Sequence, residues 1–335
     1  MAQLRTRVKY FLAPHKRANY PKIEKNLAYK PRTSHCFSSF LKTKYLDLEL
    51  NPYKMNLVLT GSTSGIGWET LLTLLPQFDQ VFLPVRNLTK AQKLIQGLPQ
   101  KEKIKLVYLD LSNLVSVKEG AAVLLSQVDE IQVLINNAGG MYPSGKQTAE
   151  GLDLSFSSNH LGQFLLFQEL LPALIKGQAK VIQVSSEAHR IAGPPQQDFS
   201  LRKSSSTVAS YAKVKLYNIL FTNEIVTKYE SEGLSAYSLH PGAVRTAFGS
   251  EASPWAKGLI AFTKLFFISP KAGAATTIFL ATTPKENLKN GGYYKNKKLS
   301  FPSTLSRDPK LAKALWEFSL VEIQRVLTNT GTHKK

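Results

Sequence analysis

Tyr211 and Lys215 lie four residues apart in the segment Tyr-Ala-Lys-Val-Lys, so on a helix they share one face. A phenol titrates near pH ~10, which is too high for ready proton exchange at neutral pH. A neighbouring ammonium stabilises the phenolate and lowers the pKa of the phenol. The pair therefore predicts a tyrosine general acid and base, with a lysine that also reaches ribose hydroxyls. The same spacing is common on plain surface helices.

Other polar residues are placed to assist such a tyrosine. Ser185 and Ser186 follow Val184 at the end of a predicted strand and can present a hydroxyl to polarise a carbonyl. Asn159 lies in the preceding predicted helix, where its amide can hold a water in a proton relay near Lys215. His240-Pro241-Gly242, with Thr246, predicts a rigid turn that suits the carboxamide end of a nicotinamide.

A glycine-rich corner stands at the start of the predicted body. Residues Thr60–Gly67 read Thr-Gly-Ser-Thr-Ser-Gly-Ile-Gly, between an apolar strand and a helical pattern. Glycines let the backbone approach a pyrophosphate closely, and the helix N-terminus offers free N–H groups and partial positive charge. The corner predicts a dinucleotide site, although many turns are glycine-rich.

The ends of the next strands refine the predicted cofactor. Arg86 stands where folds that prefer NAD carry an acid for the ribose 2′-hydroxyl, and a guanidinium can grip a 2′-phosphate there. NADP(H) is therefore expected over NAD(H), with a solvated surface arginine as the alternative. Asp110-Leu111 ends the third strand beside the adenine, and Asn136–Gly139 ends the fourth beside the ribose.

The pattern from Met55 alternates strand and helix, which is typical of a parallel sheet covered on both faces. We expect an α/β fold, a single doubly wound Rossmann-type domain with a mostly parallel sheet of about seven strands. The expected strands are Asn56–Thr60, Gln80–Pro84, Ile104–Leu109, Val133–Asn136, Ala179–Val184, Ser235–His240 and Tyr293–Leu299. The expected helices are Gly67–Leu75, ended by Pro76, then Lys90–Gln96, Leu114–Val128, Gly151–Leu174, Ala209–Ser231 and Pro270–Ala281.

Composition limits the possible partners. The 335-residue chain has one cysteine, Cys36, so neither an intrachain disulfide nor a thiolate metal cluster can form. The net charge of +20 favours anionic partners such as phosphorylated cofactors or acidic membrane surfaces. Nucleic acid is not expected, since no finger, RNA-binding aromatic motif or basic heptad helix is found.

Residues 1–54 differ from the rest of the chain. They carry twelve Lys or Arg against three acids, with four prolines and little periodicity. Three interpretations stay open: a targeting presequence, a disordered basic arm, or a segment absent from a protein that starts at Met55. Residues 55–325 are predicted as the dinucleotide-binding domain and residues 326–335 as a short basic tail. The expected location is cytoplasmic or at a membrane surface, and organellar if residues 1–54 are a presequence.

Residues 55–320 resemble the short-chain dehydrogenase/reductase family, specifically its retinol-dehydrogenase-like branch. Six motifs carry the resemblance and occur in order over most of the body: TGSTSGIG at Thr60–Gly67, NNAG at Asn136–Gly139, SNHLGQFLL at Ser158–Leu166, VSSEAH at Val184–His189, YAKVKLYNILFT at Tyr211–Thr222 and HPGAVRTAF at His240–Phe248.

The resemblance implies a catalytic tetrad of Asn159, Ser186, Tyr211 and Lys215, with Ser186 in place of Ser185 because relatives carry the catalytic hydroxyl at the second position. It implies hydride transfer between NADP(H) and a carbonyl or its alcohol. The expected cofactor-binding residues are Gly61, Ser64, Gly65, Ile66, Gly67, Arg86, Asp110, Leu111, Asn137, Ala138, Gly139, Tyr211, Lys215, Pro241, Gly242, Val244 and Thr246.

The substrate is less constrained. Residues 255–267 are rich in Trp, Leu and Phe, which suits a lid over a lipophilic aldehyde or ketone, a helix on a membrane surface, or an ordinary core helix. Residues 191–206 are expected to form a loop beside the site. The histidines are not spaced as metal ligands, and the sequence leaves the oligomeric state open. The alternative function is a non-catalytic NADP(H)-binding sensor or scaffold that uses the basic arm.

Overall fold

A computed structural model describes residues 54–194, 198–242 and 268–332 of the chain. Several predictions lie outside these residues: the nature of residues 1–53, the cofactor contacts of Val244 and Thr246, and the apolar segment 255–267. Among the described residues, no helix combines the length and the hydropathy that a membrane span requires.

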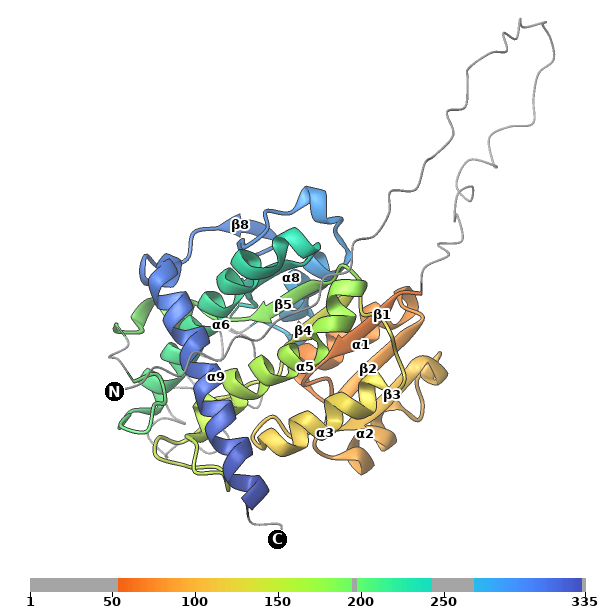
Figure 1. Ribbon diagram of the computed structural model, residues 1–335. Helices are drawn as coiled ribbons and strands as arrows, with labels where there is room; N and C mark the ends of the chain where they lie inside the picture. The colour runs from red at the N-terminus through yellow and green to blue at the C-terminus, as the bar shows by residue number, and fades with distance from the viewer. Residues whose placement is uncertain (1–53, 195–197, 243–267, 333–335) are drawn as a thin grey trace, which may run out of the picture. The chain divides into compact units, whose positions relative to one another are not determined.

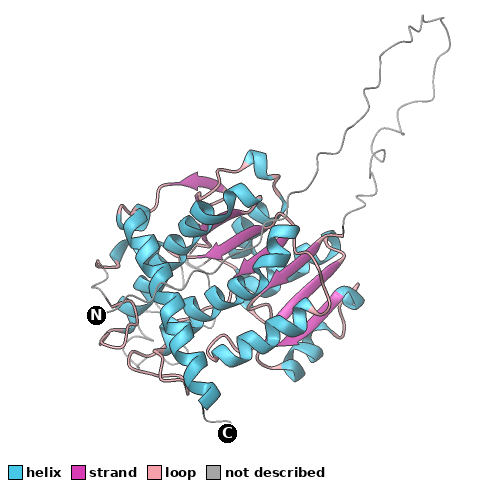
Figure 2. Cartoon of the chain, in the orientation of Figure 1, coloured by secondary structure: helices cyan, strands magenta, loops and turns pink. Residues whose placement is uncertain are grey.

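An eight-stranded sheet forms the centre of the domain, as Figures 1 and 2 show. Its strand order is β3-β2-β1-β4-β5-β6-β7-β8, and every neighbouring pair is parallel except β7 with β8. The strands are β1 Asn56–Leu59, β2 Gln80–Val85, β3 Ile104–Tyr108, β4 Val133–Asn136, β5 Lys180–Val184, β6 Ser235–His240, β7 Tyr293–Lys295 and β8 Lys298–Ser300. The predicted doubly wound α/β fold is confirmed.

Helices cover both faces of the sheet and bury one hydrophobic core on each. Helices α3, α5, α6 and α9 pack over one core, and α1, α2 and α8 contribute to the other. The helices are α1 Gly65–Leu74, α2 Leu88–Ile95, α3 Leu114–Leu125, α4 Leu154–Phe156, α5 Gly162–Lys176, α6 Thr207–Tyr229, α8 Pro270–Thr282 and α9 Pro309–Thr332. Because parallel strands end at one edge, the loops that follow them meet there.

The prediction of one continuous strand over Tyr293–Leu299 is wrong, because the segment forms two short strands. Strands β7 and β8 form an antiparallel hairpin, because Asn296 and Lys297 turn the chain with φ of 52° and 60°. This left-handed pair is typical of a two-residue hairpin turn. The turn was not predicted because Asn296-Lys297 contains no glycine, the usual sequence signal of such a turn.

The predicted helix Gly151–Leu174 is also corrected. Its first turn, α4, starts at Leu154, where the Asp153 carboxylate accepts a hydrogen bond from the Phe156 N–H at 3.0 Å. A π-helical turn, Ser157–Leu161, then separates α4 from α5. Wider turns of this kind often occur at functional sites, and this one carries Asn159.

Helix α9 has no counterpart among the predicted elements. It begins after Asp308, whose carboxylate accepts from the Lys310 N–H at 2.8 Å, and Pro309 suits a first helical position. Leu315 and Trp316 bury the inner face of the helix against α5 and α6. The helix continues through residue 325, where the sequence placed the end of the domain.

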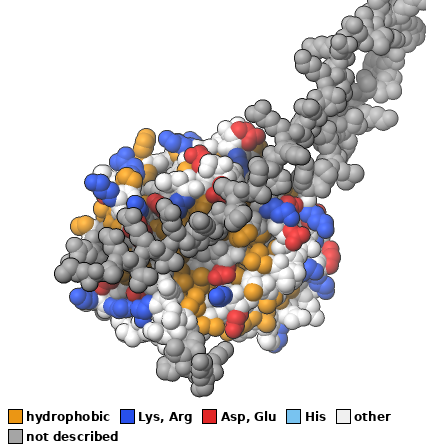
Figure 3. Space-filling model, in the orientation of Figure 1, with side chains coloured by type: hydrophobic (Ala, Val, Ile, Leu, Met, Phe, Trp, Pro, Cys, Tyr) orange, Lys and Arg blue, Asp and Glu red, His pale blue; other side chains and the backbone are white. Residues whose placement is uncertain are grey.

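One face of the molecule shows how its basic side chains are distributed (Figure 3). In Figure 3, the visible Lys and Arg side chains are spread around one face and do not gather in a single patch. A dispersed charge of this kind differs from the concentrated stripe that tracks a nucleic-acid backbone.

Candidate active site

A cleft of about 780 Å³ lies at the carboxyl ends of the parallel strands. It brings together most residues that the sequence predicts for a dinucleotide, from the segments that follow β1, β2, β3, β4 and β6, from the start of α1 and from α6. Those that line it are Gly61, Ser64, Gly65, Ile66, Gly67, Arg86, Asp110, Leu111, Asn137, Ala138, Gly139, Tyr211, Lys215 and Pro241. Gly242 follows Pro241 but is not among the lining residues.

The glycine corner has the geometry that a dinucleotide requires. Gly61 and Gly65 have φ of 68° and 55°, values that residues with a Cβ rarely adopt. A Cβ on Gly67 would lie 2.1 Å from the Gly61 carbonyl oxygen, so only glycine lets α1 pack on this turn. The Ser64 side chain forms no hydrogen bond with the first turn of α1. The corner therefore fits a pyrophosphate on the helix N-terminus.

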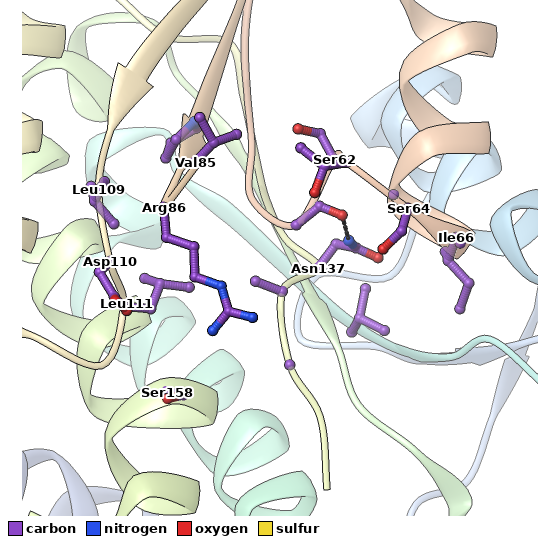
Figure 4. Close-up of a pocket in the computed structure, with 18 of the residues that line it drawn as sticks. Ser62, Ser64, Ile66, Val85, Arg86, Leu109, Asp110, Leu111, Asn137 and Ser158 are labelled. Carbon is purple, nitrogen blue, oxygen red and sulfur yellow. Dashed lines mark hydrogen bonds between the residues drawn. The ribbon is translucent and has the colours of Figure 1, made fainter. Parts of the chain in front are cut away.

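Asn137 fixes the corner to β4. Its Nδ2 donates to the carbonyl oxygens of Thr60 at 3.0 Å and Gly61 at 3.1 Å, and its backbone N–H donates to the Thr60 Oγ1 at 3.0 Å. The predicted support between neighbouring strands is thus present in the structure, while the side chain also lines the cleft (Figure 4).

Arg86 is exposed at the end of β2, and its side chain extends into the cleft (Figure 4). The next residue, Asn87, caps α2 by accepting from the Lys90 N–H at 2.8 Å. Lys90 lines the same end of the cleft, which places a second cation there. Lys90 was not predicted from the sequence, because a single lysine one turn into the helix after Arg86 forms no motif.

Asp110 and Leu111, which the sequence predicts beside the adenine, follow β3 and line the cleft. The Asp110 carboxylate accepts from the Ser112 N–H at 2.9 Å and from its hydroxyl at 2.7 Å. A Cβ on Gly162 would lie 2.1 Å from the Leu111 carbonyl oxygen, so α5 packs directly against this segment. Both predicted residues are therefore held at the cleft by local and tertiary contacts.

Tyr211 and Lys215 share a face of α6, as their spacing predicts. The Lys215 Nζ lies 5.5 Å from the centre of the Tyr211 ring and donates to the Val184 carbonyl oxygen at 2.9 Å. Lys215 is buried, whereas Tyr211 is half-buried and borders the cleft. The buried ammonium is thus fixed between α6 and the end of β5.

The predicted lowering of the Tyr211 pKa is wrong for this structure. Burial raises the pKa of Tyr211 to about 12, and a side-chain hydrogen bond with Ser186 offsets only part of that rise. Burial also lowers the pKa of Lys215 to about 8. At neutral pH the phenol therefore carries its proton, and the lysine remains cationic.

Asn159 is completely buried and reaches the chain that follows β4. Its Oδ1 accepts from the Gly140 N–H at 2.9 Å, and its Nδ2 donates to the Gly140 oxygen at 3.1 Å. A Cβ on Gly139 would lie 2.6 Å from the Asn159 Oδ1 and 3.4 Å from the Lys215 Nζ. Asn159 and Lys215 thus meet at Gly139.

The two serines after β5 have different surroundings. Ser185 is buried, and its hydroxyl donates to the Lys215 carbonyl oxygen at 2.6 Å. Ser186 is half-buried; its Oγ accepts from the Ala188 N–H at 3.2 Å and shares a hydrogen bond with Tyr211. The Ser186 hydroxyl thus meets the phenol, whereas the Ser185 hydroxyl is bonded to the backbone of α6.

Some residues of the cleft were not predicted from the sequence, because they are apolar or because their polar side chains have no spacing that marks a chemical role. They are Leu109, Tyr142, Ser158, Val184 and Pro270, together with Ser62 and Thr63 in the glycine corner and Asn87 and Lys90 near Arg86. In the described part of the chain, no three His, Cys, Asp or Glu side chains are close enough to hold a metal ion.

The fold and the cleft together define an oxidoreductase that uses a nicotinamide dinucleotide. The family model of the short-chain dehydrogenases matches residues 55–257, which is more than half of the chain. The chain belongs to the short-chain dehydrogenase/reductase family, and it is an oxidoreductase that acts on CH–OH donors with NAD(P) as acceptor.

Curated relatives confirm the retinol-dehydrogenase-like assignment. Human retinol dehydrogenase 11 is 31% identical over 268 residues, covering 78% of this chain and 83% of the relative. Human retinol dehydrogenase 12 is 32% identical over 269 residues, covering 78% and 84%. A crystal structure of an uncharacterised protein from Mycobacterium paratuberculosis aligns with a TM-score of 0.65 and 26% identity, covering 81% of this chain and 93% of that one.

Proposed function

We propose that this enzyme reduces lipophilic aldehydes or ketones with NADPH, and oxidises the matching alcohols with NADP⁺. One observation carries the cofactor preference: Arg86 and Lys90 both line the end of the cleft where the adenine ribose would lie. Two cations there would bind a 2′-phosphate. Arg86 also stands in place of the acid that would accept a hydrogen bond from the ribose 2′-hydroxyl of NAD. NADPH also occurs in a structural neighbour, the carbonyl reductase from chicken fatty liver, with a TM-score of 0.56 and 22% identity, covering 75% of this chain and 100% of that one.

The cofactor supplies hydride, and the chain supplies binding and a proton. Gly61, Gly65 and Gly67 would cradle the pyrophosphate, and Lys215 would approach the ribose on the nicotinamide side. Asn159 holds the Gly139–Gly140 segment that borders this region.

Tyr211 is assigned as the general acid, and Ser186 as the hydroxyl that polarises the carbonyl. A phenol with a pKa of about 12 is fully protonated at neutral pH, so it is ready to donate to an alkoxide as the carbonyl is reduced. The Ser186 hydroxyl, hydrogen-bonded to that phenol, would orient the carbonyl oxygen between the two groups. Alcohol oxidation needs transfer of the alcohol proton to a Tyr211 phenolate. Burial disfavours that phenolate at neutral pH.

A lipophilic substrate is favoured by two observations. The relatives named retinol dehydrogenase act, by their names, on a long apolar alcohol. On the described surface, Ile191 lies five residues beyond Ser186 and is 69% exposed, and Val208, near the start of α6, is 51% exposed. Such residues suit an apolar entrance beside the proposed proton donor.

A panel of carbonyls tests the proposal. The full chain would be assayed with NADPH and with NADH against decanal, benzaldehyde, all-trans-retinal and a 3-keto steroid, following loss of reduced nicotinamide absorbance. We expect turnover of at least one long apolar carbonyl and a kcat/KM for NADPH at least about tenfold above that for NADH. Equal use of NADH would refute the cofactor assignment, and silence across the panel would refute the substrate class.

A further inference from the structure

Two histidines beyond the cleft hold the backbone on the C-terminal side of Ser186. His189 is buried in the short 3₁₀ turn Glu187–Ile191. Its Nδ1 lies 2.6 Å from the Ser186 carbonyl oxygen, and its Nε2 lies 3.0 Å from the backbone N of Ser303. The imidazole therefore links the peptide of Ser186 to the chain after β8.

These contacts fix the tautomer of His189. A peptide N–H can only donate, so the Nε2 that faces the Ser303 N–H must be unprotonated. The single ring proton of the neutral imidazole then lies on Nδ1 and donates to the Ser186 oxygen. A second proton on His189 would place an N–H against the N–H of Ser303.

His240 holds the next peptide with the opposite tautomer. The Glu187 N–H donates to its Nδ1 at 3.2 Å, so the ring proton of neutral His240 lies on Nε2. His240 ends β6 directly before Pro241, which lines the cleft. One side chain thus joins the Ser186 segment to the turn on the cofactor side.

Charged side chains surround the two histidines, and most of their hydrogen bonds are to Glu187. Its carboxylate accepts from the Tyr293 hydroxyl at 2.8 Å, from Arg190 at 3.1 Å and from Lys295 at 3.3 Å. Burial acts to raise the pKa of Glu187, but these three bonds hold it at about 2. The Tyr293 ring also packs edge-on against His189, with centroids 5.1 Å apart.

We propose that His189 and His240 are positioning residues that hold Ser186 in its place only while both imidazoles are neutral. The inference rests on the proposed function in one respect, since it takes Ser186 as the hydroxyl that meets the substrate carbonyl. Protonation of His240 at Nδ1 places an N–H against the Glu187 N–H and breaks that contact. Protonation of His189 at Nε2 opposes the Ser303 N–H and breaks the link from the Ser186 peptide to the chain after β8, although Nδ1–H still donates to the Ser186 oxygen. The reaction then loses its oriented hydroxyl in acid.

The neutral state is favoured at physiological pH. Burial lowers the pKa of His240 to about 4, with Lys295 and His189 acting in the same direction and Glu187 opposing them. Burial also lowers the pKa of His189; the Ser186 carbonyl and Glu187 act to raise it, and Arg190 acts to lower it. Both anchors should therefore persist at neutral pH, and the His240 anchor should fail as the pH falls toward 4.

Nuclear magnetic resonance on the full chain with ¹⁵N-labelled histidine tests the anchors without any substrate. The His189→Asn and His240→Asn variants assign the two signals. We expect His189 with its proton on Nδ1, His240 with its proton on Nε2, and both neutral at pH 7. The proposal is overturned if either ring is cationic at pH 7 or has the other tautomer.

Matched variants test the effect on Ser186. In His240→Asn, the amide oxygen can replace Nδ1 as acceptor for the Glu187 N–H but cannot be protonated near neutral pH. His240→Leu removes the acceptor. Hydrogen exchange of the Glu187 amide should be about tenfold faster in the leucine variant, which corresponds to one lost buried hydrogen bond, and should stay near the wild-type rate in the asparagine variant. Equal exchange in all three proteins overturns the proposal.

Kinetics with NADPH and decanal complete the test. We expect kcat to fall about tenfold in His240→Leu. His240→Asn should keep most of the activity, and its kcat should fall less than that of the wild type as the pH is lowered. An unchanged kcat and pH profile in the leucine variant contradicts the positioning role. If the wild-type protein reduces no carbonyl at all, the proposed function fails, whereas the resonance and exchange measurements still decide whether the histidines hold the Ser186 segment.

Discussion

The carboxamide of Asn159 bonds to both backbone polar groups of Gly140, accepting from its N–H at 2.9 Å and donating to its oxygen at 3.1 Å. The same Nδ2 donates to the Ser155 carbonyl oxygen at 3.0 Å. One buried side chain in a π-helical turn therefore fixes the chain that leaves β4 beside Lys215. In this arrangement Asn159 shapes the backbone that borders the cleft.

Asn159→Ala should lower both stability and turnover. It leaves the N–H and the oxygen of Gly140 without their partner, and we expect the free energy of unfolding to fall by about 2 kcal/mol. Urea unfolding followed by circular dichroism measures the loss. Asn223→Ala is a suitable comparison, because the Asn223 side chain donates one bond, to the Ser306 oxygen, and neither residue lines the cleft. A larger loss in Asn223→Ala than in Asn159→Ala would contradict the central place of Asn159.

Tyr211→Phe should stop the reaction and keep the cofactor site. The variant loses only the proton donor, so kcat should fall by about three orders of magnitude or more. NADPH binding, measured by fluorescence titration, should change by less than about threefold. Turnover within tenfold of wild type would remove Tyr211 from the role of general acid.

Arg86→Ala should weaken binding of NADPH and leave that of NADH nearly unchanged. Loss of a charge-assisted contact with a 2′-phosphate costs about 2 kcal/mol, which is roughly thirtyfold in Kd. Lys90→Ala should show the same selectivity with a smaller effect, because a lysine offers one point contact. Parallel weakening of both cofactors in Arg86→Ala would mean that the guanidinium does not read the 2′ position.

Gly67→Ala should damage the cofactor corner. The added methyl group would lie 2.1 Å from the Gly61 oxygen, so α1 or the turn must shift. We expect loss of NADPH affinity or of folded protein on expression. Gly97→Ala is the matched control, since a methyl group there meets nothing within 4 Å. Equal behaviour of the two variants would show that the corner is more compliant than its geometry suggests.

His160 should make the protein sensitive to acid. The ring is completely buried among Phe156, Phe164 and Tyr217, and burial lowers its pKa to about 3 from 6.5. Because the unfolded chain binds a proton below pH 6.5 and the folded protein does not, stability is lost as the pH falls from 6.5 toward 3.

The measurement is the free energy of unfolding at several pH values. His160 should contribute a slope of about 1.4 kcal/mol per pH unit in the lower part of this window. His160→Gln removes that share of the slope and can retain a bond to the Ser319 hydroxyl, which lies 2.8 Å from Nε2 in the wild type. His189 and His240 contribute in the same sense, so a slope remains. An identical slope in both proteins would mean that His160 binds a proton as readily in the folded protein as in the unfolded chain.

The sequence by itself determined the order of strands and helices, the glycine corner and the shared face of Tyr211 and Lys215. These depend on short-range rules: side-chain period, backbone freedom at glycine, and the four-residue spacing of a helix. Arg86 was placed at the cleft for the same reason, because the end of a predicted strand fixes where the next side chain can reach. Lys90 escaped notice because a single lysine on a helix has no pattern.

Tertiary structure alone decided the features that depend on distant contacts. Helix α9 is held by burial of Leu315 and Trp316 against other helices, and His160 meets Ser319 across 159 residues of sequence. The sign of the Tyr211 pKa shift also needed the fold, because burial outweighs the lowering by the Ser186 hydrogen bond and burial cannot be read from spacing. The tautomers of His189 and His240 follow only from which peptide N–H each ring faces.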